Sequence, residues 1–94
     1  MPKITAFIPV YNRADISGEA INSILNQTEQ DFELILIDDG STDQSPDVLQ
    51  SFAEKDNRII FYRNEKNLGQ PRTRNKALDL ASGQYFASLD SDYL

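Results

Sequence analysis

Two carboxylates near the end of the chain have the spacing of a divalent metal site. Asp90 and Asp92 are separated by Ser91, and residues i and i+2 of an extended segment project to the same side. Carboxylates paired in this way supply the hard oxygen ligands that Mg2+ and Mn2+ prefer. An Asp-x-Asp pair is common by chance, but this one follows a predicted strand. It therefore predicts a site for Mn2+ or Mg2+ that would neutralise a diphosphate leaving group.

Two other segments carry side chains that could recognise a nucleoside. Tyr11, within the run Pro9-Val10-Tyr11-Asn12-Arg13, offers an aromatic face on which a nucleobase can stack. Asp38 and Asp39 are adjacent and precede Gly40. Neighbouring carboxylates repel each other, which indicates that one of them faces a donor such as a base imino N–H or a ribose hydroxyl. A plain turn or a helix cap is the alternative interpretation of each segment.

A basic cluster stands out in a chain that is acidic as a whole. It consists of Arg63, Lys66, Arg72, Arg74 and Lys76. Arg72 and Arg74 fall in the first turns of a predicted helix, where the helix dipole disfavours cations unless an anion is close. This placement favours a phosphate or acidic ligand near Arg74. A solvated helix face is the alternative, and we favour it for Lys66 and Lys76.

Four short apolar, β-branched segments must position these residues, with helical segments between them. The predicted strands are Ile4–Val10, Phe32–Ile37, Arg58–Tyr62 and Tyr85–Leu89. The stretch Leu34–Ile37 does not alternate, which is typical of a strand covered on both faces. We therefore predict an α/β fold, a Rossmann-like parallel sheet of four strands in the order 3-2-1-4 with three helices and right-handed crossovers.

Each predicted helix has one apolar face and a recognisable end. The first is capped by Asp15 or Ser17, and the second begins with Ser45 as N-cap and Pro46 at the first helical position. The third runs from about residue 71 to Gly83, which can adopt the left-handed cap conformation. The expected buried stripes are Ile16, Ala20, Ile21, Ile24 and Leu25 in the first helix, Val48, Leu49, Phe52 and Ala53 in the second, and Ala77, Leu78 and Ala81 in the third.

The predicted strand order brings the chemically interesting segments to one edge. Ligands of open parallel sheets bind beyond the carboxyl ends of the strands, where neighbouring loops converge. The loops after the first, second and fourth strands become neighbours in the order 3-2-1-4. Tyr11, Asp39 and Asp92 would then line one pocket. The polar stretch Asn64–Gln70 is predicted to be a loop.

Composition excludes several classes of protein. The chain has 94 residues, 15 acidic against 9 basic side chains, a net charge of -6, and no Cys, His or Trp. Zinc fingers, disulfide scaffolds and imidazole-based triads are thereby excluded, and the acidic balance argues against a nucleic-acid partner. The longest apolar runs are four residues, so no segment spans a membrane, and no signal peptide is evident. We predict one cytoplasmic domain over residues 1–94.

The chain also stops just after its fourth predicted strand. This leaves the last strand as a bare edge, so we expect residues 1–94 to be part of a longer protein. Regions after Leu94 could associate that protein with a membrane.

Several motifs, in chain order, resemble the N-terminal half of the glycosyltransferase family 2 domain. They are Ile8-Pro9-Val10-Tyr11-Asn12-Arg13, Ser23-Ile24-Leu25-Asn26-Gln27-Thr28, Phe32-Glu33-Leu34, Asp38-Asp39-Gly40-Ser41-Thr42-Asp43, Asn67-Leu68-Gly69, Arg74-Asn75 and Asp90-Ser91-Asp92. Together they cover nearly the whole chain and are far more specific than any one motif. Members of that family have a GT-A fold and transfer a sugar from a nucleotide-activated donor, usually with a divalent metal and with inversion at the anomeric carbon.

The resemblance implies a role for each matched residue. Pro9, Tyr11 and Asp39 would contact the base, and Asp38 would support that pocket. Asn12 and Arg74 would complete the donor-binding set, while Asp90 faces the ribose or a metal-bound water and Asp92 ligates the metal. Tyr93 stands where the family often places another acidic residue. The donor is expected to be a nucleotide-diphosphate sugar, with a UDP-sugar favoured, and the acceptor pocket and general base are expected beyond Leu94, so that this piece alone does not turn over.

Three other readings remain open. A sugar nucleotidyltransferase needs a Gly-rich, cationic loop after the first strand, and the segment Pro9–Arg13 contains no Gly. A phosphoryl-transfer domain with Asp90 as nucleophile and Asp92 as acid would leave Tyr11 unexplained. A non-catalytic binding or assembly module would self-associate through the exposed edge of the fourth strand.

Overall fold

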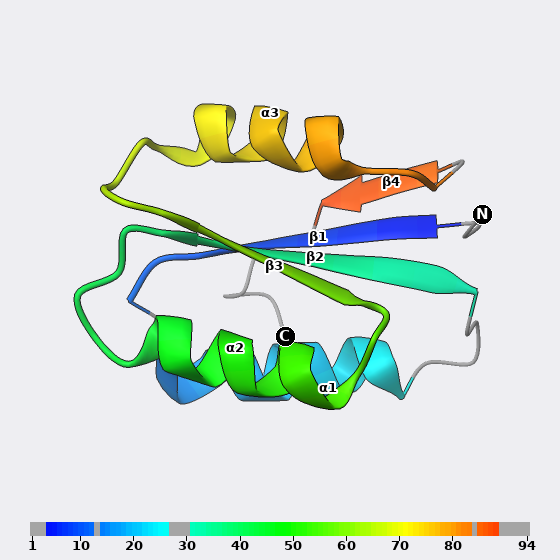
Figure 1. Cartoon of the computed structure of the whole chain (residues 1–94), viewed down its shortest axis with the longest axis horizontal. Coiled ribbons are helices and arrows are strands. Elements are labelled where there is room, and N and C mark those ends of the chain that lie inside the picture. Colours follow the sequence, from blue (N-terminus) through cyan, green and yellow to red (C-terminus); the bar gives the residue numbers. More distant parts are fainter. Residues whose placement is uncertain (1–3, 13, 27–30, 84, 89–94) are drawn as a thin grey trace.

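The structure is a computed structural model that describes residues 4–12, 14–26, 31–83 and 85–88. Its elements are β1 (Ile4–Val10), α1 (Ala14–Leu25), β2 (Phe32–Asp39), α2 (Ser45–Lys55), β3 (Ile59–Asn64), α3 (Gln70–Leu80) and β4 (Tyr85–Ser88). The strands pair in parallel in the order β3-β2-β1-β4. Figure 1 shows α1 and α2 on one face of the sheet and α3 on the other. The predicted α/β fold and strand order are confirmed.

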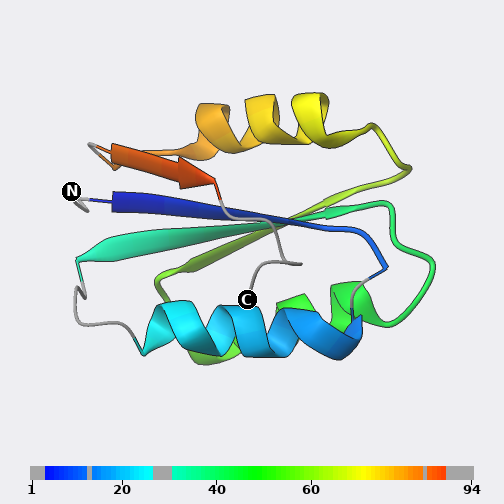
Figure 2. The same cartoon turned by 180° about the vertical axis from the view of Figure 1, so that it is seen from behind.

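The central strand β2 separates two apolar cores, because successive side chains of a strand point to opposite faces. All eight of its residues are buried, as the run Leu34–Ile37 predicts. Leu34 and Leu36 pack in a core with residues of α1 and α2, whereas Ile35 and Ile37 pack with Phe7 and Ala77 beneath α3. The view from behind in Figure 2 shows the same three layers. Each fully buried Leu or Ile contributes roughly 1.5–3 kcal/mol to stability.

The neighbouring strands β2 and β3 run further than predicted. β2 continues two residues past Ile37, and β3 ends at Asn64 rather than Tyr62. The two extensions pair with each other, with Asp38 opposite Arg63 and Asp39 opposite Asn64. The predicted strands ended too early because the prediction followed the apolar residues alone. Polar residues paired across β2 and β3 continue the ladder of backbone hydrogen bonds. Both carboxylates therefore lie on the sheet rather than in a loop.

The predicted helix caps were wrong in detail. Ser45 is the first residue of α2 rather than its cap, although Pro46 stands in the first turn as expected. The backbone N–H of Ser45 donates to Oδ1 of Asp43 at 2.8 Å. α1 begins one residue before Asp15, so both Asp15 and Ser17 lie inside the helix. α2 thus begins beside a loop carboxylate, Asp43, that was not predicted as its cap.

The third helix departs most from expectation. Leu78 is 46 % exposed instead of buried, and α3 ends at Leu80, before Gly83. Gly83 does not have the positive φ of a left-handed cap. A Cβ on Gly83 would lie 2.5 Å from Oγ1 and 2.7 Å from the backbone nitrogen of Thr5. Glycine is required at this position by close approach to β1. None of the described helices has the length and apolarity needed to cross a membrane.

Candidate functional site

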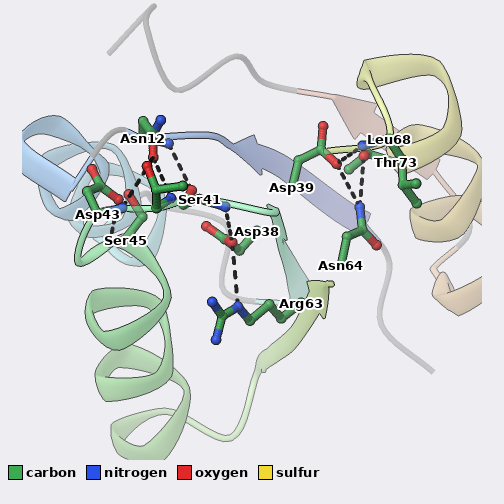
Figure 3. Close-up of polar contacts among 11 residues, drawn as sticks. Asn12, Asp38, Asp39, Ser41, Asp43, Ser45, Arg63, Asn64, Leu68 and Thr73 are labelled. Atoms are coloured by element: carbon green, nitrogen blue, oxygen red, sulfur yellow. Dashed lines mark hydrogen bonds and ion pairs between the residues drawn. The ribbon is translucent and has the colours of Figure 1, made fainter. Parts of the chain in front are cut away.

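Asn12 fastens the loop after β1 to the loop after β2. Its Oδ1 accepts hydrogen bonds from the backbone N–H of Thr42 at 2.8 Å and of Asp43 at 3.3 Å, while its own N–H donates to Oγ of Ser41 at 2.8 Å (Figure 3). Asn12 has φ 52, a left-handed conformation that Asn tolerates better than most residues. This bonding holds the preceding residue, Tyr11, at the carboxyl edge of the sheet. Tyr11 is 46 % exposed there.

Asp38 lies on the α1 and α2 face of the sheet and is fully buried. Its Oδ2 accepts a hydrogen bond from the backbone N–H of Ser41 at 2.9 Å and lies 4.0 Å from Nε of Arg63. Its Oδ1 has no hydrogen-bond partner among the described residues. A buried oxygen without a donor costs about 1–3 kcal/mol. Oδ1 of Asp38 can therefore accept a further hydrogen bond. Asp38 lies beside the side chain of Arg63, which is more than half exposed.

Asp39 points to the opposite face and is hydrogen-bonded on both oxygens. Oδ1 accepts from Nδ2 of Asn64 at 2.9 Å and from the backbone N–H of Leu68 at 2.8 Å, and Oδ2 accepts from the N–H of Gly69 at 3.0 Å. Figure 3 shows Asp38 turned toward Arg63 and Asp39 turned toward Asn64 and Leu68. The expected repulsion of adjacent carboxylates is thus relieved by strand alternation, and each finds donors within the chain.

Gly40 brings a third loop to the same edge. Its φ is +76°, and an added Cβ would lie 2.4 Å from the carbonyl carbon of Lys66 and 2.5 Å from the nitrogen of Asn67. The loops after β2 and β3 therefore meet with no space for a side chain between them. The loops after the first, second and fourth strands were predicted to meet at this edge, and the loop after β3 was not. The signal was present in Asn64, a polar residue that ends β3 beside Asp39.

A groove runs along β3 next to this edge. Its cavity volume is about 590 Å³, and its lining includes Tyr62, Arg63, Lys66 and Leu68. Nζ of Lys76 lies 4.6 Å from the centre of the Tyr62 ring, a cation–π contact on the surface. Two members of the basic cluster therefore line the groove and a third covers Tyr62. Arg72 and Arg74 are exposed on α3.

The predicted site residues fall into three groups. Pro9, Tyr11, Asn12, Asp38 and Asp39 gather at the carboxyl edge, where register places Pro9 and Asp39 on the same face of the sheet. Arg74 is on the surface of α3. Asp90 and Asp92 lie outside the described residues, and within the described part no group of three or more His, Cys, Asp or Glu side chains could hold a metal ion.

Solved structures with this arrangement are GT-A glycosyltransferases. A mannosyltransferase from Pyrobaculum calidifontis, solved with GDP-Man and Mn2+, matches 97 % of the chain with a TM-score of 0.88 and 26 % identity. TarS residues 1–349 from S. aureus, solved with UDP-GlcNAc, matches 96 % of it with a TM-score of 0.86 and 32 % identity. The chain covers 28 % and 26 % of those two chains.

The sequence places the chain in a family within that class. The model of glycosyl transferase family 2 matches residues 5–94, and the chain belongs to this family. An uncharacterised glycosyltransferase of Haemophilus influenzae is 44 % identical over 92 residues. That match covers 98 % of the chain and 37 % of the relative, so the chain spans little more than a third of the relative's length. The family resemblance read from the motifs is confirmed.

Proposed function

We propose that the chain forms the donor-binding part of a metal-dependent, inverting glycosyltransferase whose donor is a nucleotide-diphosphate sugar. The observation that carries the proposal is the bonding of Asn12 to residues 41–43, which holds the exposed Tyr11 at the carboxyl edge of the sheet, where β2 ends in Asp38 and Asp39. The mannosyltransferase and TarS, similar in fold and sequence, were solved with GDP-Man and UDP-GlcNAc respectively.

The base is held by stacking and by one carboxylate. Stacking on Tyr11 contributes about 1–3 kcal/mol and tolerates any base. Oδ2 of Asp39 accepts one hydrogen bond within the described chain, from Gly69, and a carboxylate oxygen has a second lone pair for an imino N–H. Pro9 shares that face and packs beside the base. Asp38 supports the pocket from the other face by holding Ser41. Imino recognition suits uracil and guanine, and we favour a UDP-sugar.

The diphosphate is held by cations. Arg74 is exposed on α3. The N-cap of α3 makes no side-chain hydrogen bond, and the first turn of the helix has no acidic residue. The N–H groups at the start of α3 therefore suit an anion. Asp90 and Asp92 would hold Mn2+ or Mg2+, since paired carboxylates have the chemistry these ions prefer. The bound metal would neutralise charge that develops on the leaving diphosphate.

Residues 1–94 are proposed to bind the donor without completing the transfer. The whole enzyme also needs an acceptor pocket and a general base. The H. influenzae relative is nearly three times as long as the segment it shares with this chain, which leaves room for both elsewhere. A labelled UDP-sugar incubated with the 94-residue chain and candidate acceptors should therefore give no product, and efficient transfer would contradict this part of the proposal.

Titration calorimetry of UDP binding tests the proposal. We expect Mn2+ to tighten UDP binding by about tenfold or more, which corresponds to about 1.4 kcal/mol or more of binding free energy. Asp92→Ala should abolish this dependence, whereas Asp79→Ala, which removes an exposed carboxylate from α3, should leave it intact. Equal UDP affinity in Mn2+ and in chelator would contradict the metal-dependent site, and binding of neither UDP nor GDP would contradict the proposed function.

Self-association is the second candidate function. Within the described residues β4 pairs with β1 and lies at the end of the sheet, so one of its edges has no partner strand. Such an edge can pair with a second copy. Size-exclusion chromatography over a wide concentration range tests this idea, and a monomer at every concentration would contradict it.

A further inference from the structure

A buried carboxylate at the opposite edge of the sheet takes no part in the proposed site. Glu33 lies near the start of β2 and is 8 % exposed. Its Oε2 accepts hydrogen bonds from Oγ1 of Thr5 at 2.6 Å and from the backbone N–H of Ser82 at 2.6 Å, and its Oε1 accepts from Oγ of Ser82 at 2.8 Å. Its hydrogen-bond donors in the described chain carry no charge.

These hydrogen bonds keep Glu33 ionised. Burial raises the pKa of Glu33, but the hydrogen bonds from Ser82, Thr5 and Gly83 together outweigh it and leave the pKa below its ordinary value. An ionised carboxylate forms stronger hydrogen bonds than a neutral acceptor. The contact between Glu33 and Ser82 is therefore a strong link between β2 and the segment that connects α3 to β4.

Thr5 extends this link to β1. Its Oγ1 donates to Glu33 and accepts from the backbone N–H of Gly83 at 2.8 Å. Gly83 is so close that a Cβ would meet the backbone of Thr5 and Ile4. Glu33, Thr5, Ser82 and Gly83 form what we call the amino-edge clamp. It joins β1, β2 and the connection between α3 and β4 at one point.

β4 is a short strand that is otherwise held by its pairing with β1 and by the packing of Phe86. It has four residues, and its register with β1 runs from Ile4 opposite Tyr85 to Phe7 opposite Ser88. Phe86 packs with Phe7 in the core beneath α3, with ring centres 6.1 Å apart, whereas Tyr85 is 63 % exposed. The clamp directly precedes β4 in the chain, because β4 begins at Tyr85, two residues after Gly83.

We propose that Glu33 is a positioning residue that sets the register of β4, the strand that precedes Asp90 and Asp92 in the sequence. This inference rests on the proposed function, because it gives those two carboxylates a role. A slip of one residue moves a strand by about 3.3 Å and turns every side chain to the other face of the sheet. Such a slip would change the pairing of β4 with β1. We therefore expect the clamp to affect the metal dependence proposed for Asp90 and Asp92.

Hydrogen exchange of the intact protein, without nucleotide or metal, tests the clamp itself. Ser82→Ala removes the hydroxyl that donates to Glu33 but keeps the backbone N–H. Thr5→Val removes the bridging oxygen, while Thr5→Ser keeps it. We expect exchange of the β4 amides to accelerate by about tenfold in Thr5→Val, and less in Ser82→Ala, with β2 and β3 unchanged. Thr5→Ser should match the wild type. Unchanged β4 exchange in both variants, or equal acceleration in all strands, would overturn the inference.

Calorimetry then tests the link to the metal. Glu33→Gln keeps the shape of the side chain but replaces one acceptor oxygen with a donor, and Glu54→Gln on the exposed face of α2 is its matched control. We expect Glu33→Gln to reduce the Mn2+ enhancement of UDP affinity by about tenfold while metal-free UDP affinity stays within about twofold. Equal loss of both, or unchanged enhancement, would overturn the inference.

The two proposals fail in different ways. If the wild-type protein binds neither UDP nor GDP, or shows no Mn2+ effect, the proposed function fails, and with it the link from Glu33 to Asp90 and Asp92. The exchange measurement still shows whether the clamp sets β4. If UDP and Mn2+ bind the wild type as expected and the Glu33 and Thr5 variants behave like it, only the clamp is wrong.

Discussion

The two edges of the sheet use carboxylates in different ways. At the amino edge, Glu33 is buried and accepts three hydrogen bonds of 2.6–2.8 Å from neutral donors. At the carboxyl edge, Asp38 is equally buried, but one of its oxygens has no partner among the described residues, and an exposed Tyr11 lies in the adjoining loop. Satisfied polar groups stabilise a fold, whereas unsatisfied ones mark places where a ligand or water completes the bonding. Both carboxylate oxygens of Glu33 are thus bonded within the described chain, whereas the carboxyl edge keeps one buried oxygen there, Oδ1 of Asp38, without a donor.

Gly40→Ala should have the largest effect, because it damages the carboxyl edge itself. An added Cβ would meet the backbone of Lys66 at 2.4 Å and would require a positive φ that alanine disfavours. We expect a loss of about 3 kcal/mol in unfolding free energy, measured by urea denaturation. Gly18→Ala is the control, since a Cβ there has ordinary contacts with Phe52. Equal stability of the two variants would contradict the tight contact between the loops.

Tyr11→Ala should separate binding from folding. The ring is nearly half exposed, so its loss should change stability little while it weakens UDP binding by about 1–3 kcal/mol. Tyr85→Ala removes an exposed aromatic from the other edge and should leave UDP affinity unchanged. Calorimetry of the two variants measures the difference. Similar UDP affinities in both would mean that Tyr11 does not stack on the base.

Asn12 tests how the carboxyl edge is held together. Asn12→Ala removes the acceptor for residues 42 and 43 and places alanine at φ 52, so we expect a loss of about 1–2 kcal/mol in stability. Asn12→Gly relieves the backbone strain but does not restore the lost hydrogen bonds. It should therefore be more stable than Asn12→Ala and less stable than the wild type. UDP affinity should fall in both variants. Wild-type UDP affinity in Asn12→Gly would show that the side chain does not position Tyr11.

The pH dependence of the unfolding free energy should show the smallest effect. It tests the hydrogen bonding of Glu33 at the amino edge. Hydrogen bonds lower the pKa of Glu33 from its ordinary value of 4.5, so the unfolded chain binds its proton first as pH falls. The stabilisation from Glu33 is therefore complete above pH 4.5 and is lost as pH falls through the lower, folded pKa. Glu33→Gln should flatten this part of the stability profile. A profile with the wild-type slope would contradict the assignment.

The architecture could be predicted from the sequence because it depends on patterns within single segments. The unbroken apolar run Leu34–Ile37 predicts a strand covered on both faces, and the structure confirms it. The strand order 3-2-1-4 was predicted as the order in which the loops after the first, second and fourth strands would be neighbours, and the order is confirmed. The run of apolar residues and the positions at which strands end can both be read from the sequence.

Contacts between distant segments could not be predicted in the same way. Gly83 has the signature of a helix cap, but its close approach to Thr5 arises only when α3 is laid across the sheet. Asp38 and Asp39 look equivalent in sequence, and strand alternation assigns one to Arg63 and the other to Asn64. Leu78 continues an apolar pattern, yet it faces solvent because α3 packs mainly through Ala77 and Leu80.

Backbone amide NMR of the isotope-labelled protein, titrated with UDP, tests the central claim most directly. We expect changes in chemical shift to be concentrated at the amides of Asn12, Ser41 and Leu68, which form hydrogen bonds at the carboxyl edge. The amide resonances of Ser82 and Gly83 at the amino edge should not shift. Shifts centred on Ser82 and Gly83, or none at Asn12 and Leu68 at saturating UDP, would contradict the assignment of the nucleotide site to the carboxyl edge.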